Sequence, residues 1–505
     1  MSSHTGSPSL AVVGLGTMGR GIAQVAAESG FTVLLHDLHP DAVQAAMESI
    51  RGVLERRLAK ARISRADFEA TLARLIPCGD LANLGGCEVV IESIVESLEA
   101  KRDLFSRLES VVCQQTLLAT NTSSLSVTAV AAGCAHPQRV VGWHFFNPVP
   151  LVRVTEIVRG LRTMPEATAR IAELAAAMGM VAVQVQDMPG FIVNHAGRAF
   201  TPEAFRMLSE GVAEFHEIDC ILKDAGGFRM GPFELIDMIG LDVAEMVMDS
   251  LYHQYYEEPR FRSSPLVRQR VAAGLLGRKS GQGFYDYPKG TLAPIPPSAT
   301  PQADLASVWV SGAETELAER LRTTLSQEGV HVVQDPQPGD DDLIVVTPLG
   351  QDVSKCATDQ GLDARRTVGV DTLPGMDRRR TLMCSPATTA AWRDRAHATL
   401  AAGGVPVTVI RDSPGFVYQR MAALIVAIGC DMAQQRIAEP EDIDRAVRAA
   451  LGYPQGPLAM GDALGPRKVV KILRNMHEAY GDPRYRPCPW LERRARLGMS
   501  LLQSD

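Results

Sequence analysis

The sequence lacks any long apolar run. Across its 505 residues, no apolar stretch approaches the roughly 20 residues that a membrane-spanning helix needs. The first nine residues contain neither lysine nor arginine and no long apolar core. They therefore predict a short disordered lead rather than a signal or transit peptide.

An excess of positive charge and paired cysteine motifs are also missing. Lysine and arginine total 51 against 58 aspartate and glutamate, and the net charge of -7 argues against nucleic acid or an anionic membrane as the main partner. The nine cysteines are odd in number and never stand in CxxC spacing, which predicts reduced thiols in a cytoplasm and no metal site. The length predicts two to four domains.

A glycine-rich turn lies near the start of the chain. Apolar residues 10–13 precede the string GLGTMG at 14–19, a helix-like run follows to Gly30, and a second apolar run at 31–35 leads to Asp37. This order of strand, glycine turn, helix, strand and acid predicts a dinucleotide-binding fold. The alternative is an α/β turn without a ligand.

Each residue of this pattern has a physical role in binding a dinucleotide. Gly14 would allow the tight turn, Gly16 the close approach of a pyrophosphate, and Gly19 the packing of helix on strand. The helix start offers free N–H groups to phosphates, and Asp37 would bind the ribose hydroxyls and repel a 2′-phosphate, which favours NAD. The predicted cofactor-binding residues here are Gly14, Gly16, Thr17, Met18, Gly19 and Asp37.

Strand and helix signals alternate through the first part of the chain. Apolar runs at 89–92, 117–121 and 140–144 predict further buried parallel strands, and so a doubly wound α/β domain over residues 9–186. A charged helical stretch at about 40–75, which breaks near Ile63 and Ser64, predicts a helical hairpin. Its arginines fit either a solvated face or a basic arm for a phosphorylated acyl carrier such as coenzyme A.

The rest of the chain contains an internal repeat. The string DMPGF at 187–191 returns as DSPGF at 412–416, EID at 217–219 returns as DID at 442–444, and Gly231-Pro232 returns as Gly456-Pro457, all at one shared offset. We therefore expect an all-α domain at 187–288, a proline-rich linker at 289–304, a degenerate dinucleotide fold at 305–410 and a second helical domain at 411–505. In the degenerate fold, Glu314 follows Gly312 and would repel a pyrophosphate.

Four polar residues of the first half fall where chemistry is expected. His144 ends a predicted strand, Glu156 follows across a proline-containing turn, Ser123 comes after the strand that ends near 121, and Asn194 lies just past the Pro-Gly turn at 189–190. Ligands of doubly wound folds bind at the carboxyl ends of the strands, and a histidine there is a candidate general base. Taken alone, His144 is equally compatible with a core histidine and with a base, and Glu156 fits a surface acid better than a catalytic partner.

Three strings shift that balance. The strings NTSS at 121–124, HFFNPVP at 144–150 and PGFIVN at 189–194 resemble the L-3-hydroxyacyl-CoA dehydrogenase family, over residues 9 to about 288 and more loosely over the repeat. The resemblance implies that His144 takes the 3-hydroxyl proton while NAD accepts the hydride, and that Glu156 orients His144. It also implies that Ser123 hydrogen-bonds the reacting oxygen and that Asn194 holds the thioester or keto group. Positions matching family residues near the cofactor are Glu96, Lys101 and Asn121.

The second half departs from this pattern. At the repeat offset, Gln419 replaces Asn194, a local alignment places Asp371 opposite His144, and its gapless continuation places Met383 opposite Glu156. We therefore expect one active site per chain. The resemblance also implies an intrachain pseudo-dimer with the second half as scaffold, and leaves a homo-oligomer open.

The acyl-CoA substrate is less defined. The double length is similar to bacterial family members that oxidise 3-hydroxyadipyl-CoA in phenylacetate breakdown, and a carboxylate-ended acyl chain needs a cation or polar pocket. His195, Arg198 and Arg153 are candidates for that pocket, although each fits a plain surface residue. The alternatives are 3-hydroxybutyryl-CoA, a free hydroxy acid, and a non-catalytic crystallin-like protein. A hydratase fusion is disfavoured because the chain begins at the dinucleotide fold.

Overall fold

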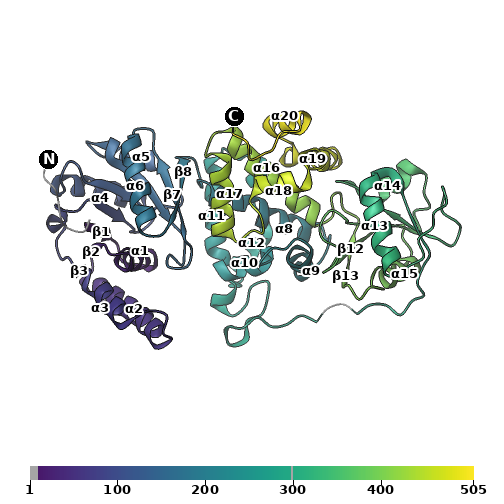
Figure 1. Ribbon diagram of the computed structural model, residues 1–505, viewed down its shortest axis with the longest axis horizontal. Helices are drawn as coiled ribbons and strands as arrows, with labels where there is room; N and C mark the ends of the chain where they lie inside the picture. The colour runs from purple at the N-terminus through teal and green to yellow at the C-terminus, as the bar shows by residue number, and fades with distance from the viewer. Residues whose placement is uncertain (1–8, 297–298, 505) are drawn as a thin grey trace. The chain divides into compact units, whose positions relative to one another are not determined.

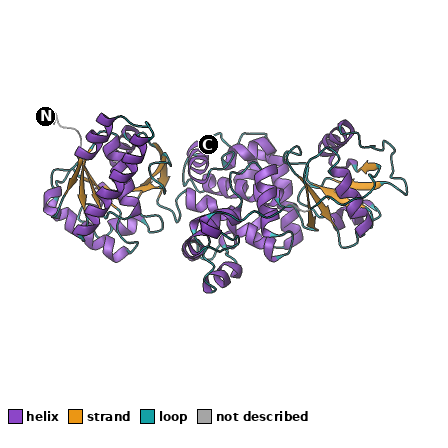
Figure 2. Cartoon of the chain, turned by 90° about the horizontal axis from the view of Figure 1, so that it is seen from below, coloured by secondary structure: helices purple, strands orange, loops and turns teal. Residues whose placement is uncertain are grey.

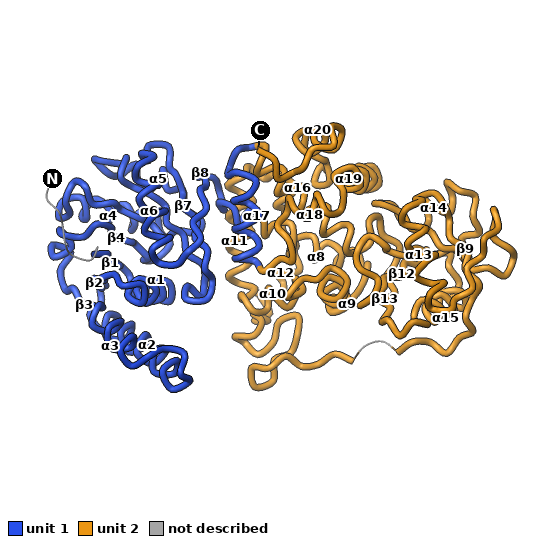
Figure 3. The backbone as a smooth tube through the Cα atoms, in the orientation of Figure 1, with its two compact units in different colours: residues 1–195, 435–451 blue, residues 196–434, 452–505 orange. Residues whose placement is uncertain are grey.

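The computed structural model describes residues 9–296 and 299–504, in two compact units. Unit 1 comprises residues 1–195 and 435–451, and unit 2 comprises residues 196–434 and 452–505 (Figure 3). The predicted N-terminal lead at 1–8, two positions of the linker (297–298) and residue 505 lie outside the described residues.

Unit 1 is built on an eight-stranded sheet with helices on both faces (Figures 1 and 2). The strand order is β3-β2-β1-β4-β5-β6-β7-β8, and all neighbours are parallel except β6 and β7. The predicted doubly wound fold is thereby confirmed. The strands are β1 (Ser9–Val13), β2 (Thr32–His36), β3 (Leu75–Pro77), β4 (Val89–Glu92), β5 (Leu117–Thr120), β6 (Val140–Phe145), β7 (Val154–Arg159) and β8 (Val181–Gln186). The covering helices are α1 (Thr17–Glu28), α4 (Leu98–Val111), α5 (Val127–Ala131) and α6 (Pro165–Ala177).

The predicted helical hairpin consists of α2 (Pro40–Ala59) and α3 (Arg65–Ala73). It breaks where expected because Ser64 caps α3: its hydroxyl accepts from the Asp67 N–H, and the Asp67 carboxylate accepts from the Ser64 N–H. In α2, Ala46, Ile50 and Leu54 are the buried side chains, so most of this helix is solvated.

Unit 1 also contains one helix from the second half of the sequence. Helix α17 (Pro440–Leu451) packs on β7 and β8. At β8, the Gln186 N–H donates to the Ile437 carbonyl at 2.8 Å, and the Gln184 N–H donates to Asp442 Oδ2 at 3.2 Å. The repeat therefore covers the last strand of the first sheet.

Unit 2 combines a second sheet with helices from both halves of the sequence. The order β13-β12-β11-β10-β9 is parallel except between β11 and β12, so it reproduces the predicted degenerate repeat. Its strands are β9 (Val308–Val310), β10 (Leu343–Val346), β11 (Thr367–Val370), β12 (Arg380–Cys384) and β13 (Val407–Arg411), with α13 (Thr315–Gln327), α14 (Val353–Gln360) and α15 (Ala390–Leu400). The other main helices are α8 (Phe200–Ser209), α9 (Phe215–Cys220), α10 (Pro232–Ile239), α11 (Leu241–Gln254), α12 (Pro265–Ala272), α16 (Tyr418–Gln434), α18 (Pro457–Leu464), α19 (Pro466–Tyr480) and α20 (Pro489–Leu497).

The repeat is visible in the geometry of its parts. The Asp187 carboxylate accepts from N–H groups at the start of α5, as the Asp412 carboxylate does at the start of α14. Phe191 and Phe416 both take left-handed backbone conformations, with φ of 48° and 51°. The contact of Gln186 with Ile437 also has a counterpart at the repeat offset, since the Arg411 N–H donates to the Val212 carbonyl at 2.9 Å.

Candidate active site

The glycine turn has little room for side chains at two of its three glycines. A Cβ at Gly14, where φ is +91°, would lie 2.5 Å from the Ser93 carbonyl oxygen, and a Cβ at Gly19 would lie 1.9 Å from the Gly14 oxygen. At Gly16, by contrast, a Cβ would meet no atom within 4 Å. Because Gly16 is also the N-cap of α1, its open side is where a pyrophosphate can approach the N–H groups of the helix.

Asp37 lies directly beside this turn. Its Oδ2 accepts from the Leu15 N–H at 2.8 Å, and its Oδ1 accepts from the His39 N–H at 3.1 Å. The carboxylate thus ties the end of β2 to the glycine loop after β1. This is the position from which an acid binds the adenosine ribose in dinucleotide folds, so the residues present fit NAD.

His144 and Glu156 form a buried pair at the antiparallel edge between β6 and β7. They are directly opposite in the strand register, and His144 Nδ1 lies 2.6 Å from Glu156 Oε2. The other carboxylate oxygen of Glu156 accepts from the N–H groups of Ile192 and Val193, each at 2.9 Å. Glu156 is fully buried, so the interpretation as a surface acid is wrong.

This pairing fixes the chemistry of the imidazole. With Nδ1–H donating to a carboxylate, the neutral ring carries its free electron pair on Nε2. The rings of Phe146 and Phe191 lie edge-on to His144, with centroids 4.5 and 5.7 Å away, and restrict its rotation. This arrangement suits His144 to act as a base, since the Glu156 carboxylate would stabilise its charged form.

Glu96 organises the loop that carries Ser123. Its Oε1 accepts from the Thr122 hydroxyl at 2.6 Å, and from the backbone N–H groups of Ser123 and Ser124 at 3.1 Å each. Burial alone would raise the pKa of Glu96, but Lys101 and these hydrogen bonds outweigh it and lower the pKa. Glu96 thus stays ionised and holds the loop.

Lys101 and Asn121 brace the same strand ends. Lys101 is buried, with its Nζ 2.6 Å from Glu92 Oε1 and 3.3 Å from Glu96 Oε2. Asn121 accepts from the Phe145 N–H at 2.9 Å and donates to the Ser93 hydroxyl at 3.3 Å, which links β5 to the ends of β6 and β4. Sequence reasoning missed Glu92, although an acid that closes the apolar run 89–91 was a visible signal.

Asn194 lies next to the Ser123 loop. Its Nδ2 is 3.4 Å from the Ser123 carbonyl oxygen, so these two predicted residues come together in unit 1 with the loop that Glu96 holds. Of the residues considered for a carboxylate pocket, Arg153 is exposed, whereas His195 is buried and is not the surface residue that its sequence allowed. Burial lowers the pKa of Arg198 to about 10.

The second half places different side chains at the corresponding positions. Gly142 pairs with Val158 across β6 and β7, and Gly369 pairs with Met383 across β11 and β12. Counting from these pairs, Asp371 corresponds to His144, as expected. Glu156, however, corresponds to Thr381, whose carbonyl accepts from the Asp371 N–H at 3.2 Å. The prediction of Met383 is wrong because the connection from Asp371 to its strand partner is shorter than the one from His144 to Glu156.

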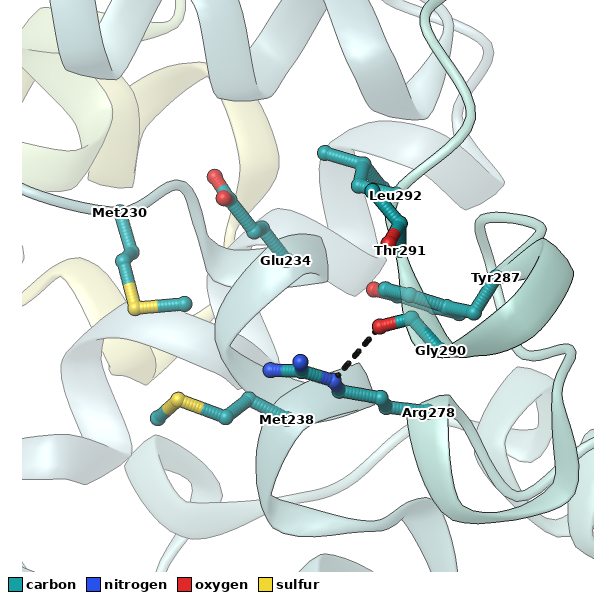
Figure 4. A pocket seen from close by; sticks show the side chains of 8 residues that line it. All are labelled: Met230, Glu234, Met238, Arg278, Tyr287, Gly290, Thr291 and Leu292. Atoms are coloured by element: carbon teal, nitrogen blue, oxygen red, sulfur yellow. Dashed lines mark hydrogen bonds between the residues drawn. The ribbon is translucent and has the colours of Figure 1, made fainter.

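Other features of the described residues bear less on this site. A cavity of about 200 Å³ in unit 2 is lined by Met230 and by residues of α10 and the segment 278–292, none of which was predicted for catalysis (Figure 4). Within residues 9–296 and 299–504 there is no group of three or more metal-ligating side chains. No helix in these same stretches is both long and apolar enough to cross a bilayer.

Comparisons with known proteins agree with this geometry. Residues 9–188 match the NAD-binding domain of 3-hydroxyacyl-CoA dehydrogenase, and residues 190–287 and 415–501 each match its C-terminal domain. A 3-hydroxyadipyl-CoA dehydrogenase of Escherichia coli K12 is 37% identical, with 97% of both chains covered. A probable 3-hydroxybutyryl-CoA dehydrogenase of Bacillus subtilis is 40% identical over 55% of this chain and 97% of its own.

A solved structure extends the match to the whole fold. The crystal structure of a 3-hydroxybutyryl-CoA dehydrogenase from Escherichia coli K12 superimposes with a TM-score of 0.84 at 35% identity, and the match covers 97% of this chain and 99% of that one. The chain therefore belongs to the 3-hydroxyacyl-CoA dehydrogenase family, with the family's NAD-binding domain in its first half and its C-terminal domain in both halves.

Proposed function

We propose that this protein oxidises the 3-hydroxyl of (S)-3-hydroxyacyl-CoA to the 3-ketone with NAD, at one site in its first half. The observation that carries the proposal is the buried contact of 2.6 Å between His144 Nδ1 and Glu156 Oε2, in the same sheet as the glycine turn. NAD, bound along the glycine turn and Asp37, supplies the hydride acceptor for C3 of the substrate.

The residues of the chain carry the proton. His144 Nε2 takes the proton of the 3-hydroxyl as the C3–H bond breaks and the C=O bond forms. Glu156 stabilises the imidazolium that results and keeps Nδ1 protonated throughout. Ser123 and Asn194, which lie together beside the Glu96 loop, hold the reacting oxygen and the thioester carbonyl.

The predicted domain boundaries remain part of this proposal. We assign the chemistry to the domains at 9–186 and 187–288, and a supporting role to those at 305–410 and 411–505. In the second half, Asp371 stands in place of the base His144 and Thr381 in place of its carboxylate partner Glu156. Gln419 stands in place of the shorter amide Asn194. We also assign the protein to the cytoplasm, on its cysteine pattern.

The substrate we favour is 3-hydroxyadipyl-CoA, with 3-hydroxybutyryl-CoA as the second candidate. The double-length relative with that activity in its name supports the first, and the name of the superimposable crystal structure supports the second. The test is kcat/KM for both thioesters. A higher value for the dicarboxylic substrate, reduced by Arg153→Gln, supports the proposal, and a higher value for the butyryl substrate contradicts it.

The reaction class is tested by NADH oxidation with acetoacetyl-CoA. We expect His144→Ala to lower turnover by about 10²–10⁴-fold, the usual contribution of a general base, with NADH binding unchanged. His253→Ala, at an exposed histidine of α11, is the control and keeps wild-type turnover. Equal turnover in His144→Ala and wild type would overturn the assignment.

The pseudo-dimer is tested with the fragment 1–290. This fragment lacks α17, so β8 becomes an uncovered sheet edge. We expect it to dimerise, or to lose activity when held monomeric by dilution. An active fragment that sedimentation shows to be monomeric would contradict the supporting role of the second half.

A further inference from the structure

A basic groove lies between α19 and α20 in unit 2. Its volume is about 440 Å³, within the roughly 300–1,000 Å³ of small-molecule sites. It is lined by Arg467, Val470, Lys471, Arg474, Asn475, Glu492, Ala495 and Arg496. Four of these eight side chains are basic and one is acidic, although the whole chain carries a net charge of -7.

The basic side chains share one surface of the helix pair. Arg467, Lys471 and Arg474 are spaced i, i+4 and i+7 along α19, which places them on one face over two turns. Glu492 of α20 holds the far end: its Oε1 accepts from Arg474 Nη2 at 2.7 Å, and its Oε2 from Arg496 Nη2 at 3.2 Å. The cations are therefore held in place before any ligand arrives.

Arg467 is anchored differently. It donates through Nε to the Ala495 carbonyl at 3.0 Å, at the C-terminal end of α20, where backbone carbonyls favour a cation. Its positive charge is thus positioned by neutral backbone groups rather than by a carboxylate in the groove. A guanidinium held in this way presents its remaining N–H donors in a fixed fork that suits phosphate oxygens.

A neighbouring hollow of about 180 Å³ shares Arg467 and Lys471 with the groove, and acidic side chains pair with both of its lysines. There Lys468 pairs with Glu316 at 2.6 Å and Lys471 pairs with Glu314, both acids coming from the start of α13 and the residue before it. The excess positive charge therefore lies on the α20 side, around Arg467, Arg474 and Arg496.

The corresponding helix of the first half lacks this charge. At the offset shared by the repeated strings, Arg467, Lys471 and Arg474 correspond to Asp242, Met246 and Asp249 of α11. The groove is thus a feature of the second half alone, and the packing of the repeated helical domain does not require its cations.

We propose that this groove binds a small anion with two or more phosphate groups, of nucleotide size. The three guanidinium groups of Arg467, Arg474 and Arg496 exceed what the single carboxylate of Glu492 neutralises, and a bisphosphate places separate charges along them. Two sources share this chemistry: the bisphosphorylated nucleotide end of coenzyme A, and a free nucleoside diphosphate. The site uses none of the residues assigned to NAD or to catalysis.

The test is equilibrium dialysis of the full chain with adenosine 3′,5′-bisphosphate, with NADH saturating the glycine turn. We expect Arg467→Gln/Arg474→Gln to weaken the groove component about tenfold or more, because two charge-assisted contacts are lost. Arg493→Gln, at an exposed arginine of α20 outside the groove, is the matched control and leaves the isotherm unchanged. Any binding of the bisphosphate in the first half is the same in all variants and therefore cancels when they are compared.

A second variant separates ligand binding from misfolding. Glu492→Gln keeps an amide oxygen that can accept from Arg474 and removes the competing negative charge, so it should tighten binding, an effect that a damaged fold does not produce. ADP as a second probe distinguishes the sources: equal binding indicates recognition of a diphosphate, and weaker binding indicates recognition of the 3′-phosphate. Identical isotherms for wild type and Arg467→Gln/Arg474→Gln, or weaker binding in Glu492→Gln, would overturn the proposal.

Discussion

The two halves of the chain use the same strand ends for opposite purposes. In the first half, a cross-strand histidine and glutamate leave an imidazole nitrogen available for chemistry. In the second half, the corresponding Asp371 is tied by the Gln419 Nε2 donor at 2.9 Å, and the same amide also bonds the Pro348 carbonyl and the Gly350 N–H. The amide of Gln419 thus takes up the side chain that corresponds to His144 in an internal hydrogen bond.

The cofactor ends of the two halves differ in the same way. Gly16 leaves open space at the start of α1, whereas Glu314 at the start of α13 pairs with Lys471. By contrast, the features that hold the fold, such as the Asp187 and Asp412 caps, are the same in both halves. The proposed catalytic capacity therefore depends on a few polar side chains that the fold itself does not need.

We expect the largest difference between the two halves from Glu156→Gln and its matched variant Thr381→Val. The amide would still accept from Ile192 and Val193, but its N–H group would face His144 Nδ1 and force the proton onto Nε2. With the wrong tautomer, we expect kcat to fall by about 10²–10⁴-fold. Thr381→Val, at the matching register position, should leave kcat unchanged. Steady-state kinetics decide, and a loss below tenfold in Glu156→Gln would contradict the base assignment.

Arg420 is the second-half counterpart of His195 and serves stability. Its guanidinium is buried, with Nη2 2.6 Å from Glu203 Oε1 and Nη1 2.8 Å from Glu210 Oε2. Arg420→Met would remove the buried cation that joins the two carboxylates and would leave Glu203 paired with Arg484 and Glu210 paired with Arg206. We therefore expect a loss of about 3–5 kcal/mol in the free energy of unfolding. Adding Glu203→Gln should restore part of it. Urea unfolding measures both, and an unchanged midpoint for Arg420→Met would refute this role.

We expect the smallest effect at Asp371, where the free energy of unfolding should depend on pH. Burial raises its pKa to about 6, above its ordinary value near 3.8, and no partner for Oδ2 is present among the described residues. Between pH 4 and 6 the folded chain keeps a proton that the unfolded chain loses, so stability falls as pH rises through this window. Asp371→Asn should remove this fall. The difference in the free energy of unfolding between Asp371→Asn and wild type should therefore grow by about 3 kcal/mol in favour of the variant from pH 4 to pH 8. If the free energies of unfolding of wild type and Asp371→Asn changed equally between pH 4 and pH 8, this prediction would be contradicted.

Most of the fold could be predicted from the sequence because its strands, turns and helix ends depend on local sequence patterns. The apolar runs before the glycine turn and before Asn121 and His144 form strands, and the hairpin breaks near Ser64 as expected. The contact of α17 with β8 was not readable, since an amphipathic pattern shows that a face is buried but not which element buries it. The shorter connection that replaces Met383 by Thr381 was invisible to a gapless alignment.

The sequence identifies the candidate site residues but not the side chains that support them. Glycines, His144 and Glu156 stand in recognisable strings, whereas the Lys101–Glu92 pair joins a helix to a strand end and depends on their packing. Glu96 was expected near the cofactor, and the structure adds that it fixes the backbone of the Ser123 loop.

The packing of α17 on β8 and the counterpart contact between Arg411 and Val212 should persist when the protein is diluted. In an association of separate subunits these contacts would weaken as concentration falls, whereas one covalent chain keeps them at a fixed effective concentration. Nor does a single chain require the two sides to be self-complementary, as two-fold symmetry does of a homodimer. Each side can therefore change alone, and an arginine can occupy one side where a histidine occupies the other.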